Sequence, residues 1–209
     1  MIKPWEIILI FIPALAIAGW LFLSQFNVFL PKQEILANTP QDEQNSITIY
    51  ADDPVIGSPT AKITLIAFEN FTCDTCKATA TILEELMQRY PKSVRIIWKG
   101  VSNGEENEKV HEYAYCANSL KQFYPFYVLA FTNSEILSED TLQKIRENIK
   151  VDKKAFDTCI ESDYGKQKRQ QAERMAIANG IKELPTIYFN DTLVPNMSSL
   201  EEWIQYLGL

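Results

Sequence analysis

Histidine and cysteine are scarce in this chain, which has one histidine and four cysteines among 209 residues. So few cysteines exclude a small scaffold held together mainly by disulfides, and a hydrophobic core must therefore supply most of the stability. The net charge is −7 and no basic cluster is present, which argues against nucleic acid as a partner. The sequence also lacks internal repeats and low-complexity segments.

Charge is absent from the N-terminal stretch between Ile7 and Leu23, and this apolar region continues to about residue 30. It is long enough for a membrane-spanning helix, which needs roughly 20 residues. Small residues at Ala14–Ala18 would suit a cleaved signal peptide, but the apolar run continues beyond them. We therefore expect residues 1–30 to form an uncleaved anchor, followed by a polar linker over residues 31–46.

A strand, a tight turn and a helix are predicted around the sequence Cys73-Asp74-Thr75-Cys76. Residues 63–68 form a nearly continuous apolar run, which is typical of a strand covered on both faces. Cys73 falls where the helix begins, and unpaired backbone N–H groups and the helix dipole favour a thiolate there. Cys76 can reach back to close a disulfide. Apolar side chains recur at helical spacing after it, at Leu83, Leu86, Met87 and Tyr90.

A Cys-x-x-Cys pair has two other interpretations, half of a zinc site or a purely structural disulfide. Zinc requires two further ligands, and only Cys116, Cys159 and His111 remain, far apart in the sequence. A structural bond between Cys73 and Cys76 would close a very small loop and stabilise the fold little. Redox chemistry explains the spacing better, so we expect no metal and no bound cofactor. With no metal partners spaced around it, His111 is expected to be a surface or helix-face residue.

The other two cysteines, Cys116 and Cys159, can pair with each other once the local pair is set aside. Such a bond would stabilise the fold by roughly 4 kcal/mol through chain entropy. It would persist only in an oxidising compartment, which would place the domain outside the cytoplasm and the N-terminus inside. The alternative is two buried free thiols on separate helices.

The rest of the chain alternates strands with a long helical region. Seven aromatic residues between Tyr113 and Phe131 are expected to pack this helical region rather than line a peptide groove. In chain order, we predict a short strand over 47–50, a buried strand over 94–98, helices throughout 105–179, a strand over 186–189 with a hairpin turn at Asn190-Asp191, and a terminal helix with a capping box at 198–201.

Five segments of the sequence stand in a particular order and spacing. They are residues 52–59, Phe68 and Phe71 before Cys73–Cys76, Tyr115-Cys116-Ala117, residues 156–160 and residues 180–190. Taken together, they resemble the DsbA-like branch of the thioredoxin fold, the extracytoplasmic thiol–disulfide oxidoreductases. The similarity covers about residues 47–209. It implies a thioredoxin-like α/β fold interrupted by an all-helical subdomain over about residues 105–179.

The resemblance also implies a mechanism and its partners. Cys73 would be the attacking thiol and Cys76 the resolving one. Pro185 would follow a cis peptide beside the dithiol, leaving the backbone of Leu184 open to pair with a client chain. Clients would be unfolded or reduced proteins, and a membrane partner of the DsbB or vitamin K epoxide reductase-like kind would restore the disulfide.

The sequence departs from that family at the site itself. Relatives often carry Pro, His or an aromatic residue where this chain has Asp74 and Thr75. A carboxylate at Asp74 disfavours a neighbouring thiolate, so we expect a weaker oxidant. Ala67 occupies a position where many relatives have an acidic proton acceptor. Glu69, two residues later, is either its substitute or an exposed turn residue.

These observations favour a membrane-tethered oxidase that introduces disulfides into translocated proteins. Two alternatives stay open. One is a reductase or isomerase kept reduced by an electron donor. The other is a non-catalytic binding module or holdase, which remains an alternative because Asp74 and Ala67 depart from the family's usual pattern.

Overall fold

The structure is a computed structural model that describes residues 47–102, 104 and 107–209. The described residues belong to one compact unit. The predicted anchor over 1–30 and the predicted linker over 31–46 lie outside them. Within the described residues, no helix combines the length and the apolar character that crossing a membrane requires.

A five-stranded mixed sheet forms the centre of the fold, with strand order β1-β3-β2-β4-β5. β2 and β3 run parallel, and the other neighbouring pairs are antiparallel. β2 lies in the middle, and Leu65 to Phe68 are buried, as the continuous apolar run predicted. The strands are β1 (Val55–Gly57), β2 (Ile63–Glu69), β3 (Val94–Gly100), β4 (Thr186–Phe189) and β5 (Thr192–Leu193).

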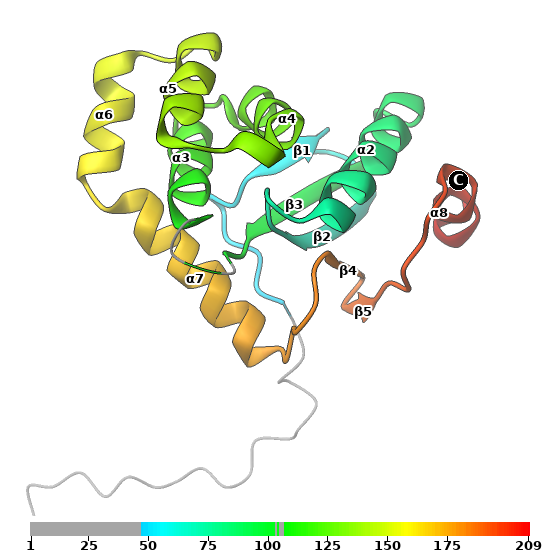
Figure 1. The fold of residues 1–209 in the computed structure, drawn as a ribbon. Helices are drawn as coiled ribbons and strands as arrows, with labels where there is room; N and C mark the ends of the chain where they lie inside the picture. The colour runs from blue at the N-terminus through cyan, green and yellow to red at the C-terminus, as the bar shows by residue number, and fades with distance from the viewer. Residues whose placement is uncertain (1–46, 103, 105–106) are drawn as a thin grey trace, which may run out of the picture. The chain divides into compact units, whose positions relative to one another are not determined.

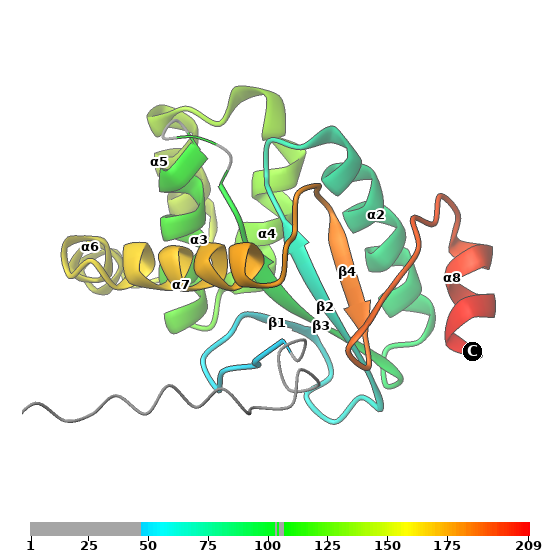
Figure 2. The ribbon, with the colours of Figure 1, turned by 90° about the horizontal axis from the view of Figure 1, so that it is seen from below.

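Helices group beside the sheet in two sets (Figures 1 and 2). The region predicted to be helical over 105–179 forms α3 to α7, while α2 and α8 pack against each other. The helices are α2 (Asp74–Arg89), α3 (Glu108–Ser119), α4 (Phe123–Thr132), the short η3 (Ser134–Ile136), α5 (Glu139–Asn148), α6 (Lys153–Glu161), α7 (Tyr164–Ala178) and α8 (Leu200–Leu207).

Alternating side chains of β2 enter two different cores. Leu65 and Ala67 belong to the larger core, which also contains buried residues of α2, α3, α4 and α8. Ile66 and Phe68 belong to a smaller core that includes Ala176 of α7. Because successive strand residues point to opposite faces, helices cover both faces of the strand that leads into the Cys-x-x-Cys turn.

Two of the predicted elements are wrong in detail. Residues 47–50 form no strand, because the Thr48 carbonyl accepts a hydrogen bond from the buried Lys99 ammonium at 2.9 Å instead of a strand partner. The first strand is Val55–Gly57, which lies between two turn clusters and is too short to show a period. The capping box uses Ser199 and Glu202, one residue later than predicted.

Candidate active site

The two cysteines of the turn are joined by a disulfide at the start of α2, with their Cα atoms 5.1 Å apart. Cys73 is the N-cap residue, and its sulfur accepts a hydrogen bond from the backbone N–H of Cys76 at 3.1 Å. The Cys76 side chain is fully buried, whereas Cys73 is partly exposed. An incoming thiol can therefore reach the Cys73 sulfur first, and the Cys76 N–H already donates to that sulfur.

The loop before β4 lies against this disulfide. The peptide bond between Leu184 and Pro185 is cis. The Leu184 carbonyl oxygen lies 3.6 Å from the Cys73 sulfur and accepts a hydrogen bond from the Thr75 hydroxyl at 3.1 Å. The same hydroxyl is 3.1 Å from the Cys73 sulfur. Asp74 and Thr75 are both exposed, so Thr75, Leu184 and the reactive sulfur meet at the surface.

A cavity of about 270 Å³ opens next to Thr75 and Pro185. Its wall combines one face of α2 with the segment that leads into α8. The remaining lining residues are Ala78, Thr79, Ile82, Asn196, Met197 and Ser198.

Glu69, the last residue of β2, is buried and is not an exposed turn residue. Its carboxylate accepts a hydrogen bond from the Tyr127 hydroxyl of α4 at 2.9 Å. Burial raises the pKa of Glu69 to about 8, although the hydrogen bond from Tyr127 acts in the opposite direction. The carboxyl group is therefore largely protonated at neutral pH and sits where the sheet meets the helical subdomain. Ala67, at the family's usual acidic position, is buried and apolar.

His111 lies on the buried face of α3, so the surface alternative of its prediction is wrong. Its ring stacks on Trp98 with centroids 5.8 Å apart, and its Nδ1 lies 2.7 Å from the Asn107 carbonyl. Burial lowers the pKa of His111 to about 4, which keeps the ring neutral. Gly100 makes room for the stack, since a Cβ there would come within 2.2 Å of Trp98 and 2.6 Å of His111.

Replacing Glu69 by glutamine should change how stability depends on pH. The folded-state pKa of about 8 lies above the value of 4.5 for a free glutamate, so the wild type loses stability as pH rises from about 4.5 to 8. Glutamine does not titrate. The stability of Glu69→Gln relative to wild type should therefore increase across that window, by on the order of a few kcal/mol.

Urea unfolding of both proteins between pH 4 and 9 measures this difference. His111 makes stability depend on pH in the opposite direction, but it does so equally in both proteins and therefore cancels in the difference. Glu84→Gln is a suitable control, because Glu84 also accepts a tyrosine hydroxyl, from Tyr124, but lies at the surface. If the difference in stability between wild type and Glu69→Gln stays constant with pH, Glu69 is ionised in the folded protein.

The second pair of cysteines is joined as well. Cys116 of α3 and Cys159 of α6 form a disulfide with Cα atoms 5.8 Å apart. Cys116 is fully buried and Cys159 partly exposed, and the Ser119 hydroxyl lies 3.8 Å from the Cys159 sulfur. The alternative of two free thiols therefore does not describe this structure. The bond connects two helices of the subdomain, and neither of its cysteines stands at the start of a helix.

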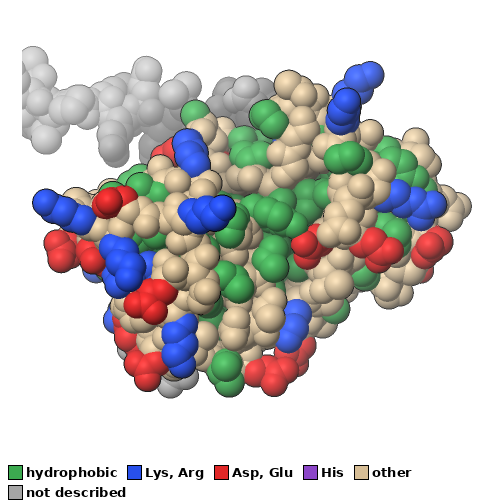
Figure 3. Space-filling view, turned by 90° about the horizontal axis from the view of Figure 1, so that it is seen from above, with side chains coloured by type: hydrophobic (Ala, Val, Ile, Leu, Met, Phe, Trp, Pro, Cys, Tyr) green, Lys and Arg blue, Asp and Glu red, His purple; other side chains and the backbone are tan. Residues whose placement is uncertain are grey.

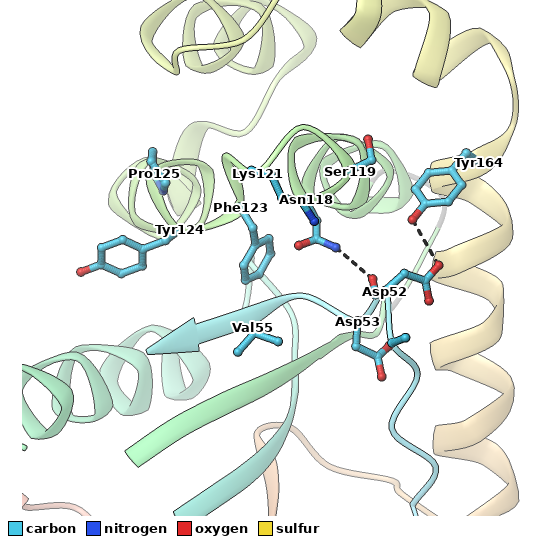
Figure 4. A pocket seen from close by; sticks show the side chains of 11 residues that line it. Asp52, Asp53, Val55, Asn118, Ser119, Lys121, Phe123, Tyr124, Pro125 and Tyr164 are labelled. Carbon is cyan, nitrogen blue, oxygen red and sulfur yellow. Dashed lines mark hydrogen bonds between the residues drawn. The ribbon is translucent and has the colours of Figure 1, made fainter. Parts of the chain in front are cut away.

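A cavity of about 510 Å³ lies between β1 and the α3–α4 turn, and neither Cys73 nor Cys76 lines it. Figure 4 shows Asn118 of α3 and Tyr164 of α7 converging on Asp52 at its edge. Lys168 also pairs with the Asp52 carboxylate at 2.6 Å. None of the predicted site residues lines this cavity, so we assign the chemistry to the dithiol instead.

The sequence predicts Pro185, Leu184, Asp74, Thr75 and Glu69 as substrate-binding or active-site residues, but it does not predict the hydrogen bond from the Thr75 hydroxyl to Leu184. It predicts Tyr127 only as a packing aromatic, so the hydroxyl of Tyr127 is the functional group that sequence reasoning missed. A buried tyrosine hydroxyl needs a polar partner, so a nearby buried carboxyl group was the available signal for Tyr127. Of the seven aromatic residues predicted to pack the helical region, six are buried and Tyr124 is exposed.

Metal ligands do not cluster in the part of the chain that the structure describes. All four cysteines are used in disulfides. On the face shown in Figure 3, Lys and Arg side chains are interspersed with Asp and Glu. The absence of a nucleic-acid partner stays a prediction.

Comparison with known proteins gives the family. A family model described as thioredoxin matches residues 50–208, so the chain belongs to this family. Among curated proteins, none matches the chain in sequence.

Solved structures show the same fold. The thiol-disulfide exchange protein alpha-DsbA2 from Wolbachia pipientis is 17% identical with a TM-score of 0.68, covering 76% of this chain and 87% of its own. ScsC from Proteus mirabilis is 18% identical with a TM-score of 0.65, covering 94% and 88% respectively. BdbD from Bacillus subtilis is 15% identical with a TM-score of 0.63, covering 75% and 91%. The chain therefore shares its fold with the thiol-disulfide exchange protein alpha-DsbA2 and with ScsC.

Proposed function

We propose that this protein catalyses dithiol–disulfide exchange through Cys73 and Cys76, and that it introduces disulfides into translocated proteins. One observation carries the proposal. The dithiol stands at a helix N-terminus with one sulfur partly exposed and the other buried, beside the cis-peptide loop at Leu184 and Pro185. This arrangement separates an attacked sulfur from a resolving one, as exchange through a mixed disulfide requires.

In the proposed direction, a client thiolate attacks the Cys73 sulfur and breaks its bond to Cys76. A mixed disulfide forms between the client and Cys73, and Cys76 leaves as a thiolate that takes up a proton. A second client thiolate then attacks the client's own bridged sulfur and releases Cys73. Two electrons have passed from the client to the protein, and a client disulfide has formed.

The electrons must then leave the protein, so the proposal includes a membrane reoxidant of the DsbB or vitamin K epoxide reductase-like kind. It also includes an oxidising, extracytoplasmic location. The disulfide between Cys116 and Cys159 supports this location, because such bonds persist mainly in oxidising compartments. Anchoring through residues 1–30 is part of the same proposal.

Two activity assays separate the possible directions. An oxidase should restore activity to a reduced, disulfide-bearing enzyme in the presence of an oxidant. A reductase or isomerase should instead reduce insulin, or repair a wrongly bridged client, when a dithiol is supplied. We expect the refolding activity to dominate.

Cys73→Ser is the control for both assays. Turnover only in insulin reduction would replace the oxidase with a reductase. No turnover in either assay, with wild type and Cys73→Ser behaving alike, would favour a non-catalytic binding module.

A further inference from the structure

Thr75 contacts two groups that the proposed reaction uses. Its hydroxyl donates a hydrogen bond to the Leu184 carbonyl at 3.1 Å and lies 3.1 Å from the Cys73 sulfur. A hydroxyl group carries one proton, so it donates fully to only one of these acceptors at a time. In the disulfide state the carbonyl is the stronger acceptor, because a disulfide sulfur is neutral and accepts weakly.

Reduction reverses this preference. When a dithiol such as dithiothreitol breaks the Cys73–Cys76 bond, it becomes a cyclic disulfide and leaves two thiols on the protein. Ionisation of Cys73 then releases its proton to water and leaves a thiolate at the N-cap of α2. An ionised acceptor forms a hydrogen bond roughly twice as strong as a neutral one.

We propose that the Thr75 hydroxyl is a redox-dependent switch, donating to the Leu184 carbonyl in the disulfide state and to the Cys73 thiolate in the reduced state. This inference rests on the proposed exchange function and adds a residue to its site. The thiolate would then have two donors, the Thr75 hydroxyl and the Cys76 backbone N–H at 3.1 Å. Together they offset the carboxylate of Asp74, which disfavours the thiolate.

The switch also links the dithiol to the backbone that faces clients. In the disulfide state Thr75 occupies one acceptor site of the Leu184 carbonyl, and in the reduced state it leaves that site open. A client chain that donates an N–H to this carbonyl would therefore bind the reduced protein more tightly. By linkage, the bound client would favour the reduced state by the same factor.

Two substitutions test the switch. Thr75→Val keeps the branched shape and removes the hydroxyl, and Thr75→Ser keeps the hydroxyl. Ultraviolet thiolate absorbance should show that ionisation of Cys73 becomes about tenfold less favourable in Thr75→Val, the difference expected between a charge-assisted hydrogen bond and the neutral one to Leu184 that it replaces. The equilibrium with dithiothreitol should shift about tenfold toward the disulfide, which equals about 30 mV. Thr75→Ser should stay within about twofold of wild type.

Carbonyl ¹³C NMR of Leu184 in the full chain tests the other half of the switch. In wild type this signal should move on reduction, as the hydroxyl leaves the carbonyl, and in Thr75→Val it should move much less. The switch is overturned if the Cys73 thiol of Thr75→Val ionises as in wild type or if Thr75→Ser behaves like Thr75→Val. It is also overturned if the Leu184 carbonyl signal of wild type does not move on reduction. The NMR measurement needs only wild type, so it decides even if Thr75→Val fails to fold.

These readouts involve no client. If the ionisation constant of Cys73 and the equilibrium constant with dithiothreitol shift as expected in a protein that turns over no client, the proposed function fails and the switch stands. If clients are turned over equally by all three proteins with unchanged constants, the switch fails and the function stands.

Discussion

Replacing Cys73 by serine should abolish exchange activity, because the partly exposed sulfur at the start of α2 is the one a client can reach. Cys76→Ser should behave differently. It retains the Cys73 thiol but lacks the resolving thiol, so a mixed disulfide with the client should accumulate. Incubating Cys76→Ser with a client that carries a disulfide, followed by non-reducing electrophoresis, should show a covalent complex that dithiothreitol dissolves.

Cys73→Ser is the matched control for this trapping experiment, since it changes the same dithiol and leaves the buried Cys76. It should trap little, because the Cys76 side chain is fully buried. Equal trapping by both variants, or trapping only by Cys73→Ser, would assign the attacking role to Cys76 and contradict the site described above.

Removing the second disulfide should cost stability and leave the chemistry in place. The bond between Cys116 and Cys159 spans a sequence separation of 43 residues. A loop of that size corresponds to roughly 4 kcal/mol of chain entropy. For a domain of this length, Cys116→Ala should lower Tm by about 10 °C, measured by circular dichroism. Exchange activity at low temperature should persist, because the dithiol lies elsewhere.

Cys159→Ala distinguishes the stability that comes from the disulfide bond from the stability that comes from burying a cysteine side chain. Cys116 is fully buried, so its removal also leaves a small cavity, whereas Cys159 is partly exposed. Both single variants should lose a similar, large amount of stability, and the double variant should lose little more. A Cys159→Ala protein as stable as wild type would mean that the bond contributes nothing.

Local patterns predicted much of the fold. Asn190 and Asp191 both adopt positive φ, 48° and 61°, which suits the short hairpin that their residue types predicted. Asp152, a residue type that favours helix N-caps, caps α6, with its carboxylate accepting the Ala155 N–H at 2.8 Å. Cys73 starts α2 as the spacing required. Each of these features depends on residues within a few positions of one another.

Contacts between distant residues could not be predicted in the same way. From the sequence alone, Glu69 could equally be an exposed turn residue. In the structure it is buried, and its hydrogen-bond partner there, Tyr127 of α4, lies 58 residues away. Thr75 meets the Leu184 carbonyl across 109 residues. Side-chain periodicity carries no information about such pairs, because the topology of the sheet and the helical subdomain brings them together.

A redox titration with thiol mapping tests the central claim, that Cys73 and Cys76 form the redox centre and Cys116 and Cys159 do not. The full chain is equilibrated in thiol buffers of increasing reducing strength, alkylated, and analysed by peptide mass spectrometry. We expect Cys73 and Cys76 to become labelled together, with a midpoint nearer the roughly −120 mV of a strong oxidant than the −270 mV of thioredoxin. Cys116 and Cys159 should stay unlabelled until below about −300 mV, as structural disulfides do. A midpoint near −270 mV would contradict the oxidase direction, and labelling of Cys116 and Cys159 before Cys73 and Cys76 would contradict the assignment of the site itself.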